Sequence, residues 1–330
     1  MLFRSERVRV FIFNFGTATP FNIGVDSLKV NSQIIKIDKP LRLSAFINNY
    51  SNRSVDNLVV SMFLNDERIA QRGISLKENE NQEVMLESNI KNSGTQRLRI
   101  EIEDDEVLND NRNFVSLKVP EKFSILFLSD NSEETIFVRY ALQAADNKGQ
   151  FQIDEKRLSQ IAATNLNNYD LVFLFANEKI SSLADIQKFV QNGGGLFIFP
   201  NENLNLNYFN SLLQNFDLPI ASDKIILQNE NKILFDKVDF QHPLFSDLFV
   251  FEENRKIESP DIKNYFKINS GGKGFEIISL QDKSSFLSSY NFGKGRILVC
   301  AVPPNLSSSN FPLKGIFAPI VYNSIFYLTN

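Results

Sequence analysis

The residues with the clearest capacity for chemistry surround a run of three glycines in the stretch FVQNGGGLFIFPNEN, residues 189–203. Glycine runs bind phosphate when they follow a strand and open a helix, because the helix N-terminus then faces the anion. Here the order is reversed: a helical pattern precedes the glycines and an apolar strand follows them. The sequence therefore argues against a dinucleotide-binding loop and predicts a structural turn, with Gly193 as the helix C-cap in the left-handed region.

Covalent catalysis needs a nucleophile with a base beside it, and the chain is poor in both. Its only cysteine, Cys300, lies in the apolar stretch RILVCAV, and its only histidine, His242, precedes a proline. We expect Cys300 to be a small buried hydrophobic residue with a raised thiol pKa. We expect His242 to cap or pack, because no nucleophile accompanies it. A single cysteine also excludes a disulfide framework and a cysteine-based metal cluster, and we expect no metal and no cofactor.

Polar side chains that directly follow predicted buried strands remain as candidate ligands. They are Asp130, Asn177, Asn201 and Glu202. The carboxyl ends of parallel strands meet at one edge of a sheet, and open sheets bind ligands at that edge. The sequence therefore predicts a candidate ligand edge without a catalytic residue. The alternative is that these side chains cap the following helices, which is the usual role of single acidic and amide residues at strand ends.

The strands that would position these residues begin where the hydrophobic period changes, at Phe123. From there, continuous apolar runs at 123–128, 169–176 and 195–200 alternate with helical patterns. Such runs are typical of strands buried on both faces, and their alternation with helices predicts a parallel sheet with crossover connections. We therefore predict a flavodoxin-like α/β domain over residues 121–330.

Two helices of this domain can be described from their apolar spacing and their first residues. In the helix after the first strand, Ile136, Tyr140 and Leu142 are predicted to form the buried face. In the helix before the glycines, Ser181 or Ser182 is predicted to be the N-cap.

The first half of the chain alternates apolar and polar residues, which predicts an immunoglobulin-like β-sandwich over residues 21–120. In the stretch RLRIEIE, for example, Leu98, Ile100 and Ile102 share one face. No residue cluster in this half suggests chemistry. Residues 1–20 are interpreted as the end of a preceding segment or an edge strand.

The composition is that of a globular chain, with 43% apolar and 22% charged residues. Its 35 basic and 39 acidic residues leave a net charge of -4. No basic block stands out, which argues against nucleic acid as the partner. No apolar run approaches the ~20 residues that cross a bilayer. The chain stops without a polar tail, so we interpret it as a fragment of a longer protein.

Each half resembles a known kind of module. The stretch 41–87 resembles the adhesion-type, CARDB-like immunoglobulin module. The stretch 169–200, YDLVFLFANEKISSLADIQKFVQNGGGLFIFP, resembles the class I glutamine amidotransferase-like fold, in which the second strand leads to a catalytic Cys. Here that strand ends in Pro200, Asn201 and Glu202, so the family's Cys-His-Glu set cannot be assembled. Pro200 also lacks the backbone N–H that an oxyanion hole would use.

The order of the two modules, together with the stretches HPLFSDL and SSYNFGKGRILVCAVPPN, resembles BatA-type, aerotolerance-related bacterial membrane proteins. This resemblance implies a non-catalytic, extracytoplasmic module in the periplasm. It also implies contacts with other envelope or Bat-type proteins and attachment to the membrane through segments missing from this chain. Two alternatives stay open: a hydrolase or transferase with its site at the predicted ligand edge, and a carbohydrate- or peptide-binding module that uses the sandwich.

Overall fold

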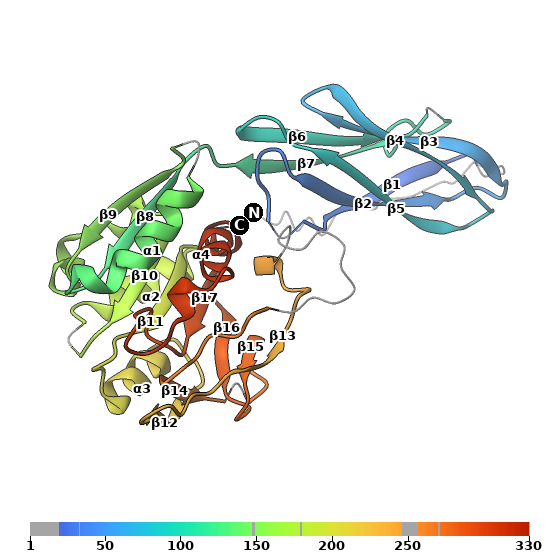
Figure 1. Cartoon of the computed structure of the whole chain (residues 1–330). Coiled ribbons are helices and arrows are strands. Elements are labelled where there is room, and N and C mark those ends of the chain that lie inside the picture. Colours follow the sequence, from blue (N-terminus) through green and yellow to red (C-terminus); the bar gives the residue numbers. More distant parts are fainter. Residues whose placement is uncertain are drawn as a thin grey trace, which may run out of the picture. The chain divides into compact units, whose positions relative to one another are not determined.

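The chain folds into two units, a β-sandwich that ends at Val119 and an α/β unit that begins at Pro120 (Figure 1). The computed structural model describes residues 20–32, 34–103, 105–146, 149–178, 180–245, 257–269 and 271–329. The interpretation of residues 1–20 as an edge strand or a preceding segment concerns residues that lie outside this part of the chain, apart from Pro20.

The first unit consists of two antiparallel sheets, as the alternating pattern predicted. One sheet has the strand order β1-β2-β5 and the other has the order β4-β3-β6-β7. The strands are β1 (Ile23–Val30), β2 (Pro40–Asn49), β3 (Val55–Leu64), β4 (Glu67–Leu76), β5 (Asn81–Asn89), β6 (Gly94–Glu101) and β7 (Arg112–Val119).

Alternation along each strand gives the sandwich its core. Leu98 and Ile100 of β6 are fully buried and Ile102 is 3% exposed, which confirms the predicted face. The turn between β3 and β4 is made by Asn65 and Asp66, whose φ angles are 48° and 74°. Two successive left-handed residues are typical of the tight hairpin turn that matches the twist of antiparallel strands.

The second unit contains an eight-stranded mixed sheet, a two-stranded sheet and helices. Its strands are β8 (Phe123–Leu128), β9 (Phe151–Lys156), β10 (Leu171–Ala176), β11 (Gly195–Pro200), β12 (Ala221–Ile226), β13 (Phe235–Val238), β14 (Asn264–Ile268), β15 (Phe275–Leu280), β16 (Ser285–Phe292) and β17 (Gly295–Cys300). Its α-helices are α1 (Ser132–Ala145), α2 (Leu183–Gln191), α3 (Leu206–Asn215) and α4 (Phe317–Leu328). Its 3-10 helices are η1 (Leu158–Ala163), η2 (Leu166–Asn168), η3 (Pro243–Phe245) and η4 (Phe311–Leu313).

The order of the parallel strands confirms the flavodoxin-like prediction. Strands β9, β8, β10, β11 and β17 lie side by side and pair in parallel. In order along the chain this is 2-1-3-4-5, the flavodoxin-like arrangement. Strands β16, β15 and β13 extend the sheet with antiparallel pairing, and β12 pairs with β14 in the small sheet.

Helices cover both faces of the large sheet, so its central strands are buried on both sides. Helices α1 and α4 pack with Phe173 and Phe175 of β10 in one apolar cluster. Helices α2 and α3 pack with Val172 and Leu174 of the same strand in the other cluster. This two-sided burial explains why these strands read as continuous apolar runs instead of alternating ones.

Two details of the helix predictions need correction. Ile136 and Tyr140 are exposed to 36% and 57%, whereas Val138 and Leu142 are fully buried. The buried residues of α1 are therefore spaced three or four positions apart and include Val138. Ile136 and Tyr140 lie outside this buried face. At the start of α2, Ser182 does occupy the N-cap position, but it is left-handed (φ 56°) and its side chain makes no capping hydrogen bond.

The three glycines form the tight turn between α2 and β11 that the sequence predicted. Gly193 has a φ of 115°, and its N–H donates to the Val190 carbonyl at 2.9 Å. Gly194 follows under the ring of Phe189, where a Cβ atom would lie 2.2 Å from Phe189 Cζ. The first glycine therefore ends the helix, and the next one allows the chain to turn closely into the sheet.

Gly195→Ala should destabilise the α/β unit. The added methyl group would lie 2.7 Å from Leu328 Cβ and 2.9 Å from the Leu328 carbonyl oxygen. Overpacking of this kind costs about 1–3 kcal/mol. Gly315→Ala is the matched control, because nothing lies within 4 Å of the methyl group added there. Urea denaturation should give a lower midpoint for Gly195→Ala alone, and equal midpoints for the two variants would contradict the close approach of β11 and α4.

Candidate functional site

The predicted ligand edge lies where β8, β10 and β11 end, and it includes the point at which the strand order reverses between β8 and β10. Flavodoxin-like sheets bind ligands at this position because the connections leave the two strands in opposite directions. The structure places Asp130 and Asn177 just after β8 and β10, and Asn201 and Glu202 just after β11. Their hydrogen bonds show which of these side chains bind backbone N–H groups.

Asp130 and Asn177 serve the local backbone. Asp130 Oδ1 accepts a hydrogen bond from the Leu158 N–H at 3.1 Å, at the first residue of η1. Asn177 Oδ1 accepts from the Glu178 N–H at 2.8 Å. Neither residue caps the helix that follows its strand: Asn131 is the N-cap of α1, Ser182 occupies that position in α2, and Asp130 and Asn177 bond to backbone N–H groups elsewhere.

Asn201 belongs to a polar cluster centred on Glu134, a residue of the first turn of α1. The Asn201 side-chain amide donates to Glu134 Oε1, and the Ser129 hydroxyl donates to Glu134 Oε2 at 2.7 Å. Burial raises the pKa of the Glu134 carboxyl, and the two hydrogen bonds oppose this shift. The charges of Asp130 and Glu202 raise the pKa of Glu134 further, so these carboxylates lie within electrostatic reach of one another.

Glu202 belongs to a second cluster, formed with the loop after β17. Its Oε2 accepts from the Asn305 side-chain amide at 3.2 Å and from the Ser307 hydroxyl. The Lys224 ammonium group donates to the Glu202 carbonyl oxygen at 2.5 Å and to the Leu204 carbonyl oxygen at 3.0 Å. Burial lowers the pKa of Lys224, and the negative charge of Glu202 opposes that shift.

The sequence located this edge and missed most of the groups that complete it. Ser129 and Glu134 flank the start of α1 in the stretch SDNSEE, and the polar residues on each side of this strand-to-helix junction are the signal that could have identified them. Asn305 and Ser307 come from the stretch NLSSSN, which by sequence is only a serine-rich loop. The structure shows that this loop folds back onto Glu202, a contact between residues more than a hundred positions apart (|i−j| = 105).

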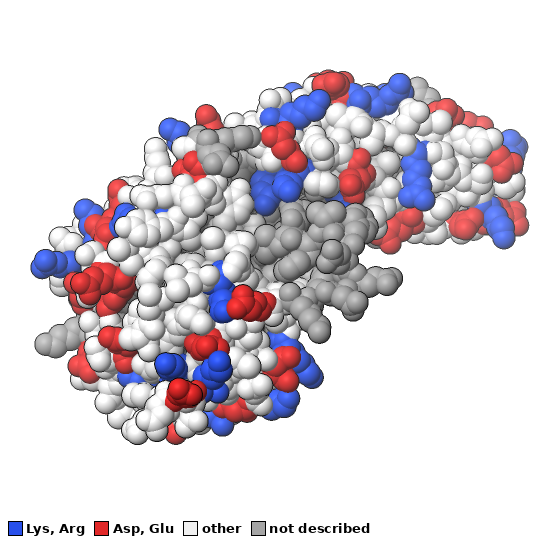
Figure 2. Space-filling model, viewed as in Figure 1, with Lys and Arg blue, Asp and Glu red and all other residues white. Residues whose placement is uncertain are grey.

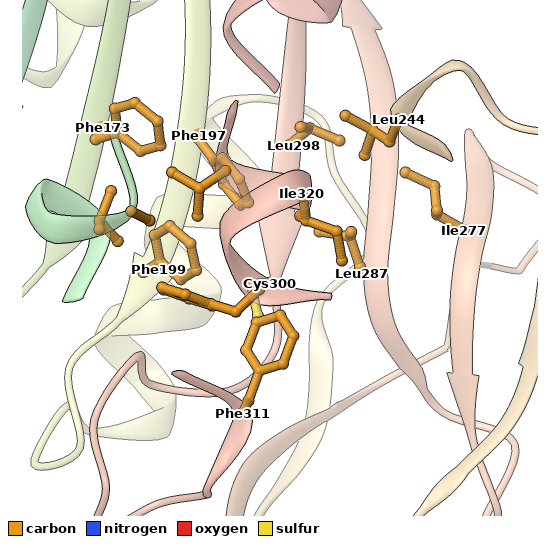
Figure 3. Close-up of a cluster of buried hydrophobic side chains, with 14 of the residues drawn as sticks. Phe173, Phe197, Phe199, Leu244, Ile277, Leu287, Leu298, Cys300, Phe311 and Ile320 are labelled. Carbon is orange, nitrogen blue, oxygen red and sulfur yellow. The ribbon is translucent and has the colours of Figure 1, made fainter. Parts of the chain in front are cut away.

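The single cysteine is buried, as the sequence predicted. Cys300 is 1% exposed, and its thiol donates weakly to the Val302 carbonyl at 3.4 Å. Its sulfur lies among apolar side chains that include Phe199 and Phe311 (Figure 3). Burial raises the pKa of the thiol to about 12, so the nucleophilic thiolate is not populated at neutral pH.

The single histidine caps and packs, which was the preferred interpretation. His242 is 7% exposed, its ring lies edge-on to Tyr327 with centroids 4.8 Å apart, and its Nδ1 accepts from the Leu244 N–H at 3.3 Å. Burial lowers its pKa to about 4. The contacts of the imidazole are thus with the start of η3 and with α4, and among the described residues none of its hydrogen bonds reaches the polar clusters at the strand ends.

A cleft of about 610 Å³ opens at the opposite end of the sheet. Its lining includes Phe216 at the end of α3, and Tyr290 and Phe292 near the end of β16. Because β16 runs antiparallel to β17, this cleft lies at the amino ends of the parallel strands, away from the ligand edge.

Comparisons with known proteins add similarities of low identity. No protein-family model matches the chain, and the search of curated proteins finds no match. A CARDB domain from Pyrococcus furiosus, solved in complex with di-metal ions, is 16% identical over 31% of this chain and 97% of that domain, with a TM-score of 0.28. A domain of a cell-surface protein from Methanosarcina acetivorans is 13% identical over 31% of this chain and 93% of that domain, with a TM-score of 0.25. A ThuA-like protein from Bacteroides uniformis is 8% identical over 63% of this chain and 91% of its own, with a TM-score of 0.43.

The burial of His242 should make the protein lose stability as the pH falls from 6.5 to about 4, the ordinary and the native pKa of this imidazole. Above this range the imidazole is neutral in both states, so its contribution is fully present. Within the range only the unfolded chain binds the proton, which favours unfolding by roughly 3 kcal/mol at the lower end.

The measurement is the free energy of unfolding from urea titrations across this pH range, for the native protein and for His242→Phe. The phenyl ring keeps the contact with Tyr327 and cannot titrate, so the difference between the two proteins should change with pH. Parallel pH profiles would show that His242 binds protons equally well in the folded and unfolded chain.

Proposed function

We propose that this chain is a non-catalytic module of a bacterial cell-envelope protein and that it acts through protein contacts. The observation that carries the proposal is the position of the two residues best suited to covalent chemistry. Cys300 and His242 are both buried in apolar surroundings, and the ligand edge holds Asn201 where amidotransferase-like enzymes have their cysteine. Acyl transfer requires a nucleophile, a base and oxyanion donors in one place.

The proposal includes the BatA-type layout and its consequences. A sandwich followed by a flavodoxin-like unit is the order found in that resemblance, with a periplasmic position, other envelope or Bat-type proteins as partners, and membrane attachment through other segments of the protein. Among the described residues, no helix is both long and apolar enough to cross a membrane. Basic and acidic side chains are interspersed over the face that Figure 2 shows, which supports a partner other than nucleic acid.

A hydrolase or transferase is the second candidate, and one observation favours it. Glu134 is a partly buried carboxyl with a raised pKa beside the strand-order reversal, and Asp130 and Glu202 lie within electrostatic reach. Perturbed carboxyls in such positions are typical of catalytic acids. A carbohydrate- or peptide-binding module is the third candidate, and the 66% exposed ring of Phe114 on β7 is the feature of the sandwich that supports it.

The first test is an assay of the purified protein with glutamine, ester and peptide substrates. We expect no turnover above the buffer background, and no difference among the native protein, Glu134→Gln and Glu202→Gln. His242→Ala is the control for a substitution outside the ligand edge. Turnover that either glutamine variant abolishes and His242→Ala retains would overturn the proposal and establish the second candidate.

The second test concerns location. An epitope tag is inserted at the exposed β3–β4 turn of the chromosomal gene product, and protease is added to spheroplasts. We expect the tag to be digested from outside the inner membrane, while a cytoplasmic marker stays intact. Protection of the tag until the membrane is lysed would contradict a periplasmic position.

A further inference from the structure

The last residues of β16 extend past the strand that pairs with them on one side. Strands β15, β16 and β17 lie side by side in the large sheet (Figure 1). The ladder with β17 continues to the end of β16, where Phe292 pairs with Gly295. The ladder with β15 begins only at Phe275, which lies opposite Ser289. Within the described residues, no strand therefore pairs with the segment 290–292 on the β15 side.

Asn291 is the residue of this segment whose backbone faces the side without a partner strand. Along an antiparallel pair, residues that bond to one neighbouring strand alternate with residues that face the opposite way. The Ala301 N–H donates to the Phe286 carbonyl at 2.8 Å, so the residues two, four and six positions after Phe286 also face β17. The N–H and C=O groups of Asn291 consequently point to the β15 side, and Asn291 is exposed.

The chain that precedes β15 turns away from β16 at this point. Gly274 has a φ of 70°, and a Cβ atom there would lie 2.4 Å from the Ser289 carbonyl oxygen. A left-handed residue interrupts a strand, because it departs from the extended backbone that a ladder requires. The ladder between β15 and β16 therefore stops at Ser289, and it leaves the backbone of Asn291 open.

The cleft of about 610 Å³ lies along this open edge. Tyr290, Asn291 and Phe292 line it from β16, and Phe216 lines it from the end of α3. Its volume is within the range of about 300–1,000 Å³ that is typical of ligand sites. An unpaired strand edge is a template for another extended chain. The cleft thus joins a free main-chain donor and acceptor to an aromatic wall.

The charges around the cleft indicate what kind of segment is complementary to it. In the described part of its lining, Lys273 and Asp217 are the charged residues, and the Lys273 ammonium group donates to Asp217 Oδ1 at 3.1 Å. Because these two charges offset each other, the cleft favours neither sign of charge in an occupant. The ring of Phe275, at the start of β15, is 65% exposed beside it. An uncharged segment with apolar side chains is therefore complementary to this surface.

We propose that this cleft binds an extended, uncharged segment of a partner protein, which adds as a strand to the open edge of β16. Strand addition obtains affinity from main-chain hydrogen bonds and specificity from the places where alternate side chains lie. The Asn291 N–H and C=O supply the hydrogen bonds. Phe275 shares a face of the sheet with Ser289, and Phe292 lies on the other face. Alternate side chains of the added strand therefore contact Phe275 and Phe292.

This binding site rests on the proposed function, because it supplies the surface through which a module of protein contacts acts. The two are tested separately. Substrate turnover and the location of the tag decide the proposed function without any peptide. A negative result in the experiments below removes this site and leaves the non-catalytic envelope module as it is.

The first experiment selects heptapeptides from a phage-displayed library on the whole chain and measures their affinity by fluorescence anisotropy. We expect uncharged peptides with apolar residues at alternate positions. Asn291→Pro removes the outward N–H, and a strand accepts proline where its N–H faces away from the neighbouring strand. This variant should bind at least about tenfold more weakly. Asn291→Ala is the matched control, because it keeps both backbone groups and should bind like the native protein. A library without binders, or equal affinities in all three proteins, would overturn the proposal.

The second experiment follows the backbone directly, through amide hydrogen exchange of the native protein with and without a selected peptide. We expect exchange at Asn291 to slow when the peptide binds, because its N–H then donates to the added strand. Exchange in β12, which is a strand of the small two-stranded sheet, should stay unchanged. Slower exchange in β12 with none at Asn291 would place the peptide elsewhere. This measurement needs no substitution, so it decides the question even if Asn291→Pro fails to fold.

The third experiment separates strand addition from binding by side chains alone. Two versions of a selected peptide are N-methylated at alternate residues, one at the odd and one at the even positions. Only alternate amides of an added strand face β16, so we expect one version to lose binding and the other to keep it. Phe275→Ala should weaken binding of the unmodified peptide, and its exposed ring makes unfolding of this variant no concern. Binding of both methylated versions would contradict strand addition.

Discussion

Burial of the central sheet on both faces is the constraint on which the rest of the α/β unit depends. Strands β10 and β11 are apolar along their whole length because α1 and α4 cover one face and α2 and α3 cover the other. Such strands can present polar side chains only at their ends. The same packing requires close turns, and the glycines before β11 allow α2 to approach the sheet without a Cβ atom in the way.

This constraint also buries the two residues best suited to covalent chemistry. Cys300 is the last residue of β17 and lies in an apolar cluster, and His242 directly precedes η3 and packs against Tyr327 of α4. The polar groups at the strand ends bind one another and form two hydrogen-bonded clusters, one around Glu134 and one around Glu202.

The sandwich follows a different rule, because each of its sheets is buried on one face only. Polar residues can therefore occur along every strand, and the side chain of Asn111, directly before β7, is fully buried. Buried side-chain oxygens without a hydrogen-bond partner occur among the described residues of both units, for example Asn22 Oδ1 in the sandwich and Ser288 Oγ in the α/β unit.

The sequence by itself determined the two kinds of module, the boundary near Val119, the parallel sheet, the structural role of the glycine turn and the burial of Cys300. These features are local: they depend on the period of apolar residues and on residue types within a few positions. The buried face of α1 was harder to predict, because the apolar residues of this helix are scattered and two different faces could be buried. Packing against the sheet buries Val138 and Leu142 and leaves Ile136 and Tyr140 exposed. Only the tertiary structure brought Glu134 to Asn201, Ser307 to Glu202, and Asn111 to Ile23. Each of these contacts joins residues at least 65 positions apart, and no pattern along the chain specifies them, because their geometry is set by how separate strands and loops pack.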